Sequence, residues 1–247
     1  MKLAGMKTAL GAMVLAAGAM TCVSASAKTS KSLEKASTNW NSRIEMTADG
    51  SHRFGNPDAP VKLTEYVSYT CPHCAHYQQQ SDPVLRLTVV PKGKVQVTVT
   101  NLLRNPVDLT VAMLANCGDP KRFFVLHNAF FATQDTWLQK AIDATKSQQQ
   151  RWYQGPMIDR MRAMASDLEL YKIMSGWGID RAQTDACLAD KAMLEKLSNQ
   201  QAEIAKLGLK STPSFTLNGK VLTDVHDWTG VSTAITSTLA DERDGTV

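Results

Sequence analysis

The sequence predicts an α/β fold into which an all-helical segment is inserted. Two stretches before that segment, residues 61–68 and 94–103, and one after it, residues 214–217, have the composition and alternation of strands. Between them, from Pro106 to about residue 190, apolar residues recur instead at helical spacing. Because strands on both sides must pair in one sheet, the helical stretch is an insertion and not a tail.

The first 27 residues have the composition of a secretory signal. Lys2 and Lys7 give a positive start, an apolar run extends from about residue 9 to 23, and Ala25-Ser26-Ala27 offers the small residues of a cleavage site. The alternative is an uncleaved membrane anchor, but the run is shorter than the roughly 20 apolar residues that cross a bilayer. We therefore expect an exported protein.

Charge says little about partners. Without Lys2 and Lys7, the 27 Lys and Arg residues become 25, against 23 Asp and Glu, a net charge of +2. No cluster of Lys and Arg stands out, so neither nucleic acid nor an anionic membrane is indicated as a partner. About 220 residues are enough for one domain with an insertion or for two small domains.

The elements follow one another in a clear order. Residues 28–56 should form a polar leader and a short first strand within 43–53, and a turn cluster over 55–60 precedes the strand at 61–68. A helix should begin at the cysteine pair and run to about Ser81, with Pro72 in its first position. One face of the helical segment is apolar, and its residues are Phe123, Phe124, His127, Phe130 and Phe131.

After the insertion, a helix over about 193–207 should end at Gly208. Asn218-Gly219 then predicts a hairpin turn between strands 214–217 and 220–223. A closing helix follows, with its apolar stripe at Trp228, Val231, Ile235 and Leu239.

Five cysteines become four once Cys22 is removed with the signal, and an even number in an exported chain favours disulfides. Cys71 and Cys74 form a CxxC pair. Haem attachment needs histidine directly after the second cysteine, where Ala75 stands. Structural zinc needs four ligands, and a purely structural disulfide across so short a loop gains little chain entropy. Both alternatives stay open beside a redox role.

The redox interpretation fits the local physics. A cysteine in the first turn of a helix faces unpaired N–H groups and the positive end of the dipole, which favour the thiolate, the attacking species. Cys71 is therefore expected to be an exposed nucleophile, and Cys74, one turn later and deeper, the resolving thiol. His73 can add a hydrogen-bond donor or a positive charge to the Cys71 sulfur.

Two further positions are unusual. Glu65 shares a strand face with Val61, Leu63, Val67 and Tyr69, where burial would raise its pKa and suit it to accept a proton from a buried thiol. The alternative is that an edge or a water channel solvates it. Thr212-Pro213, just before a strand, can hold a cis peptide bond or an ordinary trans one.

Together, the CPHC stretch, Glu65 six residues before it, and Thr212-Pro213 ahead of the hairpin resemble the DsbA family of thiol oxidases, from about Val61 to the end of the chain. The resemblance implies a thioredoxin-like fold over residues 57–105 and 190–247, with residues 106–189 as the inserted helical domain.

It also implies roles for the site residues. Cys71 would be the nucleophile and Cys74 the resolving cysteine, with Pro72 and His73 setting the redox potential. Glu65 would be the buried acid beneath the site. The remaining pair, Thr212 and Pro213, would form the cis-proline loop that faces the disulfide and binds substrate backbone.

The family implies a periplasmic monomer that oxidises extended, cysteine-containing exported proteins, needs no cofactor or metal beyond its own disulfide, and is re-oxidised by a quinone-linked membrane partner. Cys117 and Cys187 resemble the second disulfide of some alphaproteobacterial members, the alternative being two buried thiols. Threonine before the cis-proline resembles the isomerase branch, so an isomerase or reductase remains an alternative, but residues 28–56 are too few for the isomerases' dimerisation domain. A redox-silent binding or chaperone module is the third possibility.

Overall fold

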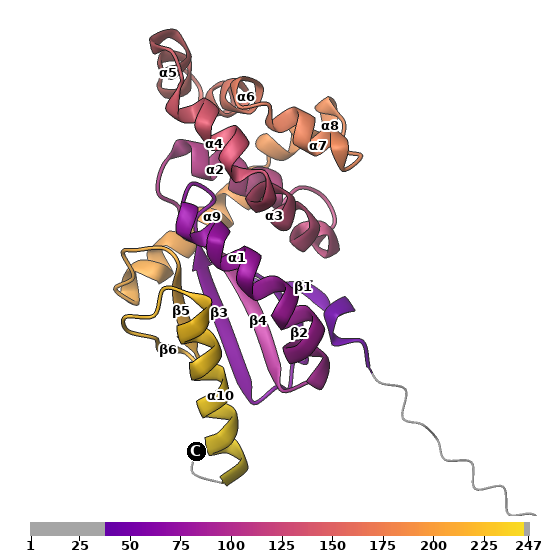
Figure 1. The fold of residues 1–247 in the computed structure, drawn as a ribbon. Helices are drawn as coiled ribbons and strands as arrows, with labels where there is room; N and C mark the ends of the chain where they lie inside the picture. Colours follow the sequence, from indigo (N-terminus) through magenta and orange to yellow (C-terminus); the bar gives the residue numbers. More distant parts are fainter. Residues whose placement is uncertain (1–37, 245–247) are drawn as a thin grey trace, which may run out of the picture. The chain divides into compact units, whose positions relative to one another are not determined.

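One mixed sheet organises residues 38–244, the part of the chain that the computed structural model describes. The predicted signal segment and the leader up to residue 37 lie outside these residues. Six strands pair in the order β1-β2-β4-β3-β5-β6 (Figure 1). They are β1 (Ile44–Met46), β2 (His52–Gly55), β3 (Val61–Val67), β4 (Val95–Asn101), β5 (Ser214–Leu217) and β6 (Lys220–Val221).

The sheet is parallel at its centre and antiparallel elsewhere. β3 and β4 run parallel, with Glu65 opposite Val99, because the helical connection between them returns the chain to the starting edge. β5 joins the other side of β3, so a strand from beyond the insertion lies directly beside one from before it. The predicted fold class, a thioredoxin fold with a helical insertion, is confirmed.

Helices cover both faces of the sheet. Figure 1 shows α1 and α10 side by side across one face, and they contact each other. On the other face, Ile204 of α9 packs with Tyr66 and Leu102, since Tyr66 points away from the face that its neighbour Glu65 occupies. In chain order, the helices outside the insertion are η1 (Trp40–Ser42), α1 (Pro72–Val84), η2 (Leu85–Val89), η3 (Val90–Lys92), α9 (Lys191–Lys206) and α10 (Trp228–Asp244).

The insertion between β4 and α9 is helical throughout its described elements. Phe123, Phe130 and Phe131 are buried, as the predicted apolar face requires. The core runs without interruption from sheet to insertion, and the described residues form one compact unit. The limits of two domains within this unit stay a prediction. The helices are α2 (Pro106–Ala115), η4 (Pro120–Arg122), α3 (Phe123–Ala132), α4 (Gln134–Ile142), α5 (Lys146–Tyr153), α6 (Met157–Asp167), α7 (Leu170–Gly176) and α8 (Arg181–Leu188).

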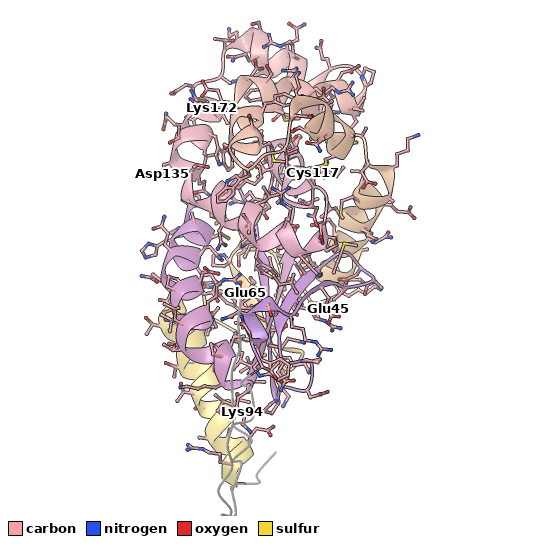
Figure 2. The ribbon with its side chains drawn as sticks, turned by 90° about the vertical axis from the view of Figure 1, so that its right-hand side faces the viewer. Glu45, Glu65, Lys94, Cys117, Asp135 and Lys172 are labelled. Carbon is pink, nitrogen blue, oxygen red and sulfur yellow. A yellow bond between two sulfur atoms is a disulfide. The ribbon has the colours of Figure 1, made fainter. Side chains whose placement is uncertain are left out.

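A disulfide joins Cys117, just after α2, to Cys187 in α8, across a sequence separation of 70 residues. Its Cα atoms are 5.4 Å apart. Figure 2 labels Cys117 within the helical part of the molecule, away from the sheet that carries Glu65.

Three details differ from the sequence expectations. The N-terminal region holds two strands, β1 and β2, instead of one, because Gly50 with φ 85° lets the chain reverse between them. α1 extends to Val84 through Pro83 and continues as a π-helical turn. β6 is only two residues long. The Asn218-Gly219 turn is confirmed, with φ values of 49° and 79°.

Candidate active site

The two cysteines of the CPHC stretch lie where β3 gives way to α1. Cys71 is the N-cap residue of α1, with an extended backbone (φ −102°, ψ 113°), and Pro72 occupies the first turn, where a missing N–H costs no helical hydrogen bond. Both cysteines are free thiols in this structure. The turn therefore presents the open N–H groups of a helix start to the Cys71 sulfur.

The surroundings of Cys71 lower the pKa of its thiol from 9.0 to about 5. The largest cause is a hydrogen bond from the Cys74 thiol, which favours the Cys71 thiolate. Burial opposes it, while the Thr212 side chain and the backbone N–H groups of Cys74 and His73 add to the lowering. Cys71 is thus a thiolate at neutral pH.

The expectation that Cys71 is exposed was wrong. The residue is only 2% exposed, because Thr212, 141 residues later, lies over its sulfur. Cys71 Sγ lies 3.2 Å from the Thr212 carbonyl oxygen, to which it donates a hydrogen bond when it is protonated. The Thr212 carbonyl therefore covers part of this sulfur.

Cys74 has the opposite environment. It is fully buried, and burial, followed by its interactions with Cys71, raises the pKa of its thiol well above 9.0. One cysteine of the pair is thus an anion and the other keeps its proton. His73 between them is exposed, and its contribution to the Cys71 pKa comes through its backbone N–H.

The loop over the site contains a cis peptide bond between Thr212 and Pro213. The Thr212 hydroxyl is buried and has no hydrogen-bond partner among the described residues, although it lies close enough to the Cys71 sulfur to lower that thiol's pKa. Ser214 Oγ donates to the Ser211 carbonyl at 2.7 Å, and His226 Nδ1 lies 3.1 Å from the Pro213 carbonyl oxygen. These contacts fix the loop on both sides of the proline.

Glu65 is buried in the centre of the sheet, at 2% exposure (Figure 2). Burial raises the pKa of its carboxyl from 4.5 to about 7, although the Tyr77 hydroxyl, which donates to Glu65 Oε1 at 2.6 Å, acts in the opposite direction. The alternative of a solvated glutamate is therefore wrong. Tyr77 lies one helical turn after Cys74, and interaction with Cys74 contributes to its own raised pKa.

Sequence reasoning missed Asp108, a buried carboxylate of the insertion that holds the turn leading to Cys71. One of its oxygens accepts from the backbone N–H of Tyr69 at 2.8 Å, and the other from Ser68 Oγ at 2.6 Å. Burial raises the pKa of Asp108 to about 6. The turn is thus bound to the first helix of the insertion.

Gln134, the first residue of α4, was missed as well. Its Nε2 donates to the carbonyl oxygens of Tyr69 at 2.7 Å and Cys71 at 3.0 Å, and the side chain is buried. Nothing in the local sequence marks Asp108 or Gln134, since each acts through contacts 39 or more residues away. Tyr77 could have been found, because residues three apart on a helix share a face.

The structure brings Cys71, Cys74 and Thr212-Pro213 together and places Glu65 beneath them through Tyr77; the disulfide of the insertion is separate. No group of three or more His, Cys, Asp or Glu side chains suited to a metal ion occurs within residues 38–244. Over the same residues, no helix combines the length and apolar character needed to cross a bilayer.

A thiolate at a helix start, a protonated partner cysteine and a facing cis-proline define a thioredoxin-fold thiol–disulfide site of the DsbA-like type. The comparisons agree. A thioredoxin family model matches residues 47–237, and the chain belongs to that family.

Among curated proteins, a Rickettsia typhi relative, provisionally named a protein-disulfide oxidoreductase, is 29% identical over 191 residues, which are 76% of this chain and 62% of the relative. The chain thus spans less than two thirds of that relative's length. Disulfide bond formation protein D of Bacillus subtilis is 23% identical over 195 residues, 77% of this chain and 78% of that protein.

Among solved structures, a protein-disulfide isomerase from Novosphingobium aromaticivorans is 41% identical, with a TM-score of 0.75 over 78% of this chain and 99% of that one. Wolbachia pipientis alpha-DsbA1 shares the fold at 19% identity, with a TM-score of 0.62 over 79% of this chain and 94% of that one.

Proposed function

We propose that the protein introduces disulfide bonds into exported proteins by thiol–disulfide exchange through Cys71 and Cys74. The observation that carries this proposal is the asymmetry of the pair: the pKa of Cys71 is lowered to about 5 and that of Cys74 is raised. Stabilising the Cys71 thiolate favours the reduced enzyme, so its disulfide takes electrons from substrates.

The exchange proceeds in two steps. A substrate thiolate attacks Cys71 Sγ of the oxidised enzyme, which forms a mixed disulfide and breaks the bond to Cys74. A second substrate thiolate then attacks the substrate sulfur of that mixed disulfide and releases Cys71 as a thiolate. The substrate loses two electrons and gains a disulfide, and the enzyme is left with two reduced cysteines.

Glu65 supplies the proton that the first step needs. Cys74 leaves as a thiol because its pKa is high, and a carboxyl with a pKa of about 7 is partly protonated at neutral pH. Tyr77 donates a hydrogen bond to Glu65 and interacts with Cys74. Its hydroxyl would therefore carry the proton from the Glu65 carboxyl to the Cys74 sulfur. During re-oxidation the same groups take the proton back.

The preference for reduction depends on pH in a defined direction. The Cys71 pKa is lowered from 9.0 to about 5, so its stabilising effect on the reduced form is fully present above 9 and is lost as pH falls through 5. The protein should be a weaker oxidant below that pH.

Equilibration with reduced and oxidised glutathione, followed by acid quenching and mass spectrometry, tests the assignment. DsbA has a potential of about −120 mV and thioredoxin of about −270 mV. We expect a value nearer the first, and a value near the second would overturn the oxidase proposal. The Cys74→Ser variant should accumulate mixed disulfides and Cys71→Ser should form none; equal loss of turnover without trapped adducts would contradict the two roles.

A second candidate function is disulfide isomerisation. The isomerase from N. aromaticivorans is 41% identical to this chain, and a threonine precedes the cis-proline here. Recovery of scrambled ribonuclease separates the two functions: an isomerase restores activity in a redox buffer efficiently, whereas an oxidase acts fastest on the fully reduced substrate.

The surroundings of the enzyme are part of the proposal. Export through the segment 1–27 would place it in the periplasm, as a monomer, with extended cysteine-containing chains as substrates and a quinone-linked membrane protein as its oxidant. Thr212 and Pro213 would pair with substrate backbone. Fractionation of cells expressing the tagged full chain tests the location, and recovery with the cytoplasm would contradict it.

A further inference from the structure

A pocket of about 330 Å³ lies between two parts of the insertion. Its volume is at the lower end of the roughly 300–1,000 Å³ typical of small-molecule sites. The chain that leads from β4 into α2 forms one wall, with Leu103, Arg104 and Leu109, and α6 forms the other. α2 and α6 contact each other. Neither the CPHC stretch nor Thr212-Pro213 contributes to the lining, so the pocket is separate from the active site.

Three methionines of α6 line this pocket, which we call the methionine pocket. Met157, Met161 and Met164 follow one another at intervals of four and three residues and therefore lie on one face of the helix. Met161 and Met164 are 3% and 1% exposed, and Met164 Sδ accepts a hydrogen bond from Thr110 Oγ1 at 3.6 Å. Met157 is 46% exposed. The pocket thus has a buried apolar floor, and flexible thioether side chains can adapt to the shape of a ligand.

The charge in the lining is positive. Arg104 and Arg160 line the pocket, and none of its described lining residues is acidic. Arg160 Nε donates to the Trp152 carbonyl oxygen at 2.7 Å, which holds that guanidinium in place. Within residues 38–244 neither guanidinium forms an ion pair. Two cations therefore lie beside an apolar floor without a carboxylate partner.

Asp108 does not neutralise Arg104. Burial raises the pKa of Asp108, and the charge of Arg104 acts in the opposite direction. However, Oδ1 of Asp108 accepts from the Tyr69 N–H at 2.8 Å, and Oδ2 accepts from Ser68 Oγ at 2.6 Å and from the backbone N–H of Arg104 at 3.0 Å. Because both carboxylate oxygens are occupied in this way, the Arg104 guanidinium stays available to another anion.

We propose that the methionine pocket binds an amphipathic anion, that is, an apolar tail that ends in a carboxylate or a phosphate. The tail would pack on Met161 and Met164, out of water, and the anionic end would accept charge-assisted hydrogen bonds from Arg104 and Arg160. Thioethers alone would also suit a soft cation such as Cu(I), but the two positive charges in the lining oppose any cation. The proposal involves no cysteine and is independent of the proposed function.

The test is a titration of the full-length protein, labelled with ¹³C at its methionine methyl groups, followed by NMR. Each resonance is assigned with a Met→Leu variant, and each ligand stays below the concentration at which it forms micelles. Octanoate or octyl phosphate should bind about tenfold more tightly than octanol, which lacks the charge, and octylammonium should not shift Met161 or Met164. The tighter of the two anions tells a fatty acid from a lipid phosphate. Each methylene added between hexanoate and octanoate should tighten binding about fourfold.

Variants identify the pocket as the binding site. Arg104→Gln and Arg160→Gln should each weaken octanoate binding about tenfold and leave octanol binding unchanged. Met157→Glu adds a like charge at an exposed position of the lining and should abolish octanoate binding. Arg162→Gln is the matched control, since Arg162 lies on the same helix, outside the lining, and pairs with Asp185 at 3.5 Å. It should bind octanoate as tightly as the wild type.

Three results would overturn the proposal. The first is equal affinity for octanoate, octyl phosphate and octanol, and the second is unchanged octanoate affinity in both arginine variants. The third is a set of shifts as large at Met46 and Met193, which lie outside the pocket, as at the three methionines of α6, because that pattern shows adsorption over the surface.

Discussion

Replacement of Glu65 by glutamine should remove a pH dependence from the stability of the protein. Burial raises the pKa of this carboxyl from 4.5 to about 7. Below 4.5 the folded and unfolded chains are both protonated, and the group has no effect. Between 4.5 and 7 the unfolded chain ionises first, so stability falls as pH rises, and the loss is complete above about 7.

The magnitude follows from the size of the shift. A difference of about 2.5 pKa units, at about 1.4 kcal/mol per unit, corresponds to about 3 kcal/mol. Glutamine keeps the shape and an oxygen that can accept from Tyr77 Oη, but it cannot ionise. The free energy of unfolding of Glu65→Gln, relative to the wild type, should therefore rise by about 3 kcal/mol between pH 4 and pH 8.

Urea denaturation of the reduced wild type and the reduced Glu65→Gln variant across this pH range measures the difference in their free energies of unfolding. Cys71 and Cys74 are present in both proteins, so their titration contributes equally to both pH profiles. Glu203→Gln is the control, since Glu203 is 64% exposed, and its profile should stay parallel to that of the wild type. Tyr77→Phe removes a hydrogen bond to the carboxylate worth about 1.5–3 kcal/mol, so it should extend the decline in stability to higher pH. Parallel profiles for wild type and Glu65→Gln would refute the reasoning.

Three further predictions concern the Cys71 thiol, the turn that carries it, and the Cys117–Cys187 disulfide. Alkylation of the reduced protein by iodoacetamide should accelerate with pH through a midpoint near 5, because the thiolate of Cys71 reacts; a midpoint near 9.0 would contradict this. Gln134→Leu leaves two buried carbonyls without their donor and should lower the free energy of unfolding by about 1–3 kcal/mol. It should also move the alkylation midpoint, whereas the exposed Gln79→Leu should change neither quantity. Replacing Cys117 and Cys187 by alanine opens a loop of 70 residues and should cost about 4 kcal/mol in the chain-entropy model; unchanged denaturation would show that the crosslink contributes nothing.

The sequence predicted those parts of the site whose physics is local. A helix start follows from Pro72 and the cysteine spacing, and the burial of Glu65 follows from strand alternation. The hairpin at Asn218-Gly219 follows from the ease with which both residues adopt positive φ. Each signal lies within a few residues of the feature that it predicts.

The parts that could not be predicted depend on contacts between distant segments. Cys71 is buried because Thr212, which lies 141 residues later in the sequence, packs over its sulfur. No sequence pattern near Cys71 predicts this contact. Asp108 and Gln134 are ordinary polar residues in their own helices, and they matter only because the fold brings them against the turn before Cys71. A strand or helix pattern cannot show which carbonyl a distant amide will meet.

These distant contacts connect the insertion to the turn that carries Cys71. Gln134 donates to the carbonyl oxygen of Cys71, and Asp108 holds the turn before it, so two helices of the insertion fix where α1 begins. The low pKa of Cys71 depends on N–H groups at that helix start, and a small shift of the turn would misdirect them. The insertion thus stabilises the geometry that lowers the Cys71 pKa, and it does so through contacts to Cys71 itself and to the two residues Ser68 and Tyr69 in the turn before it.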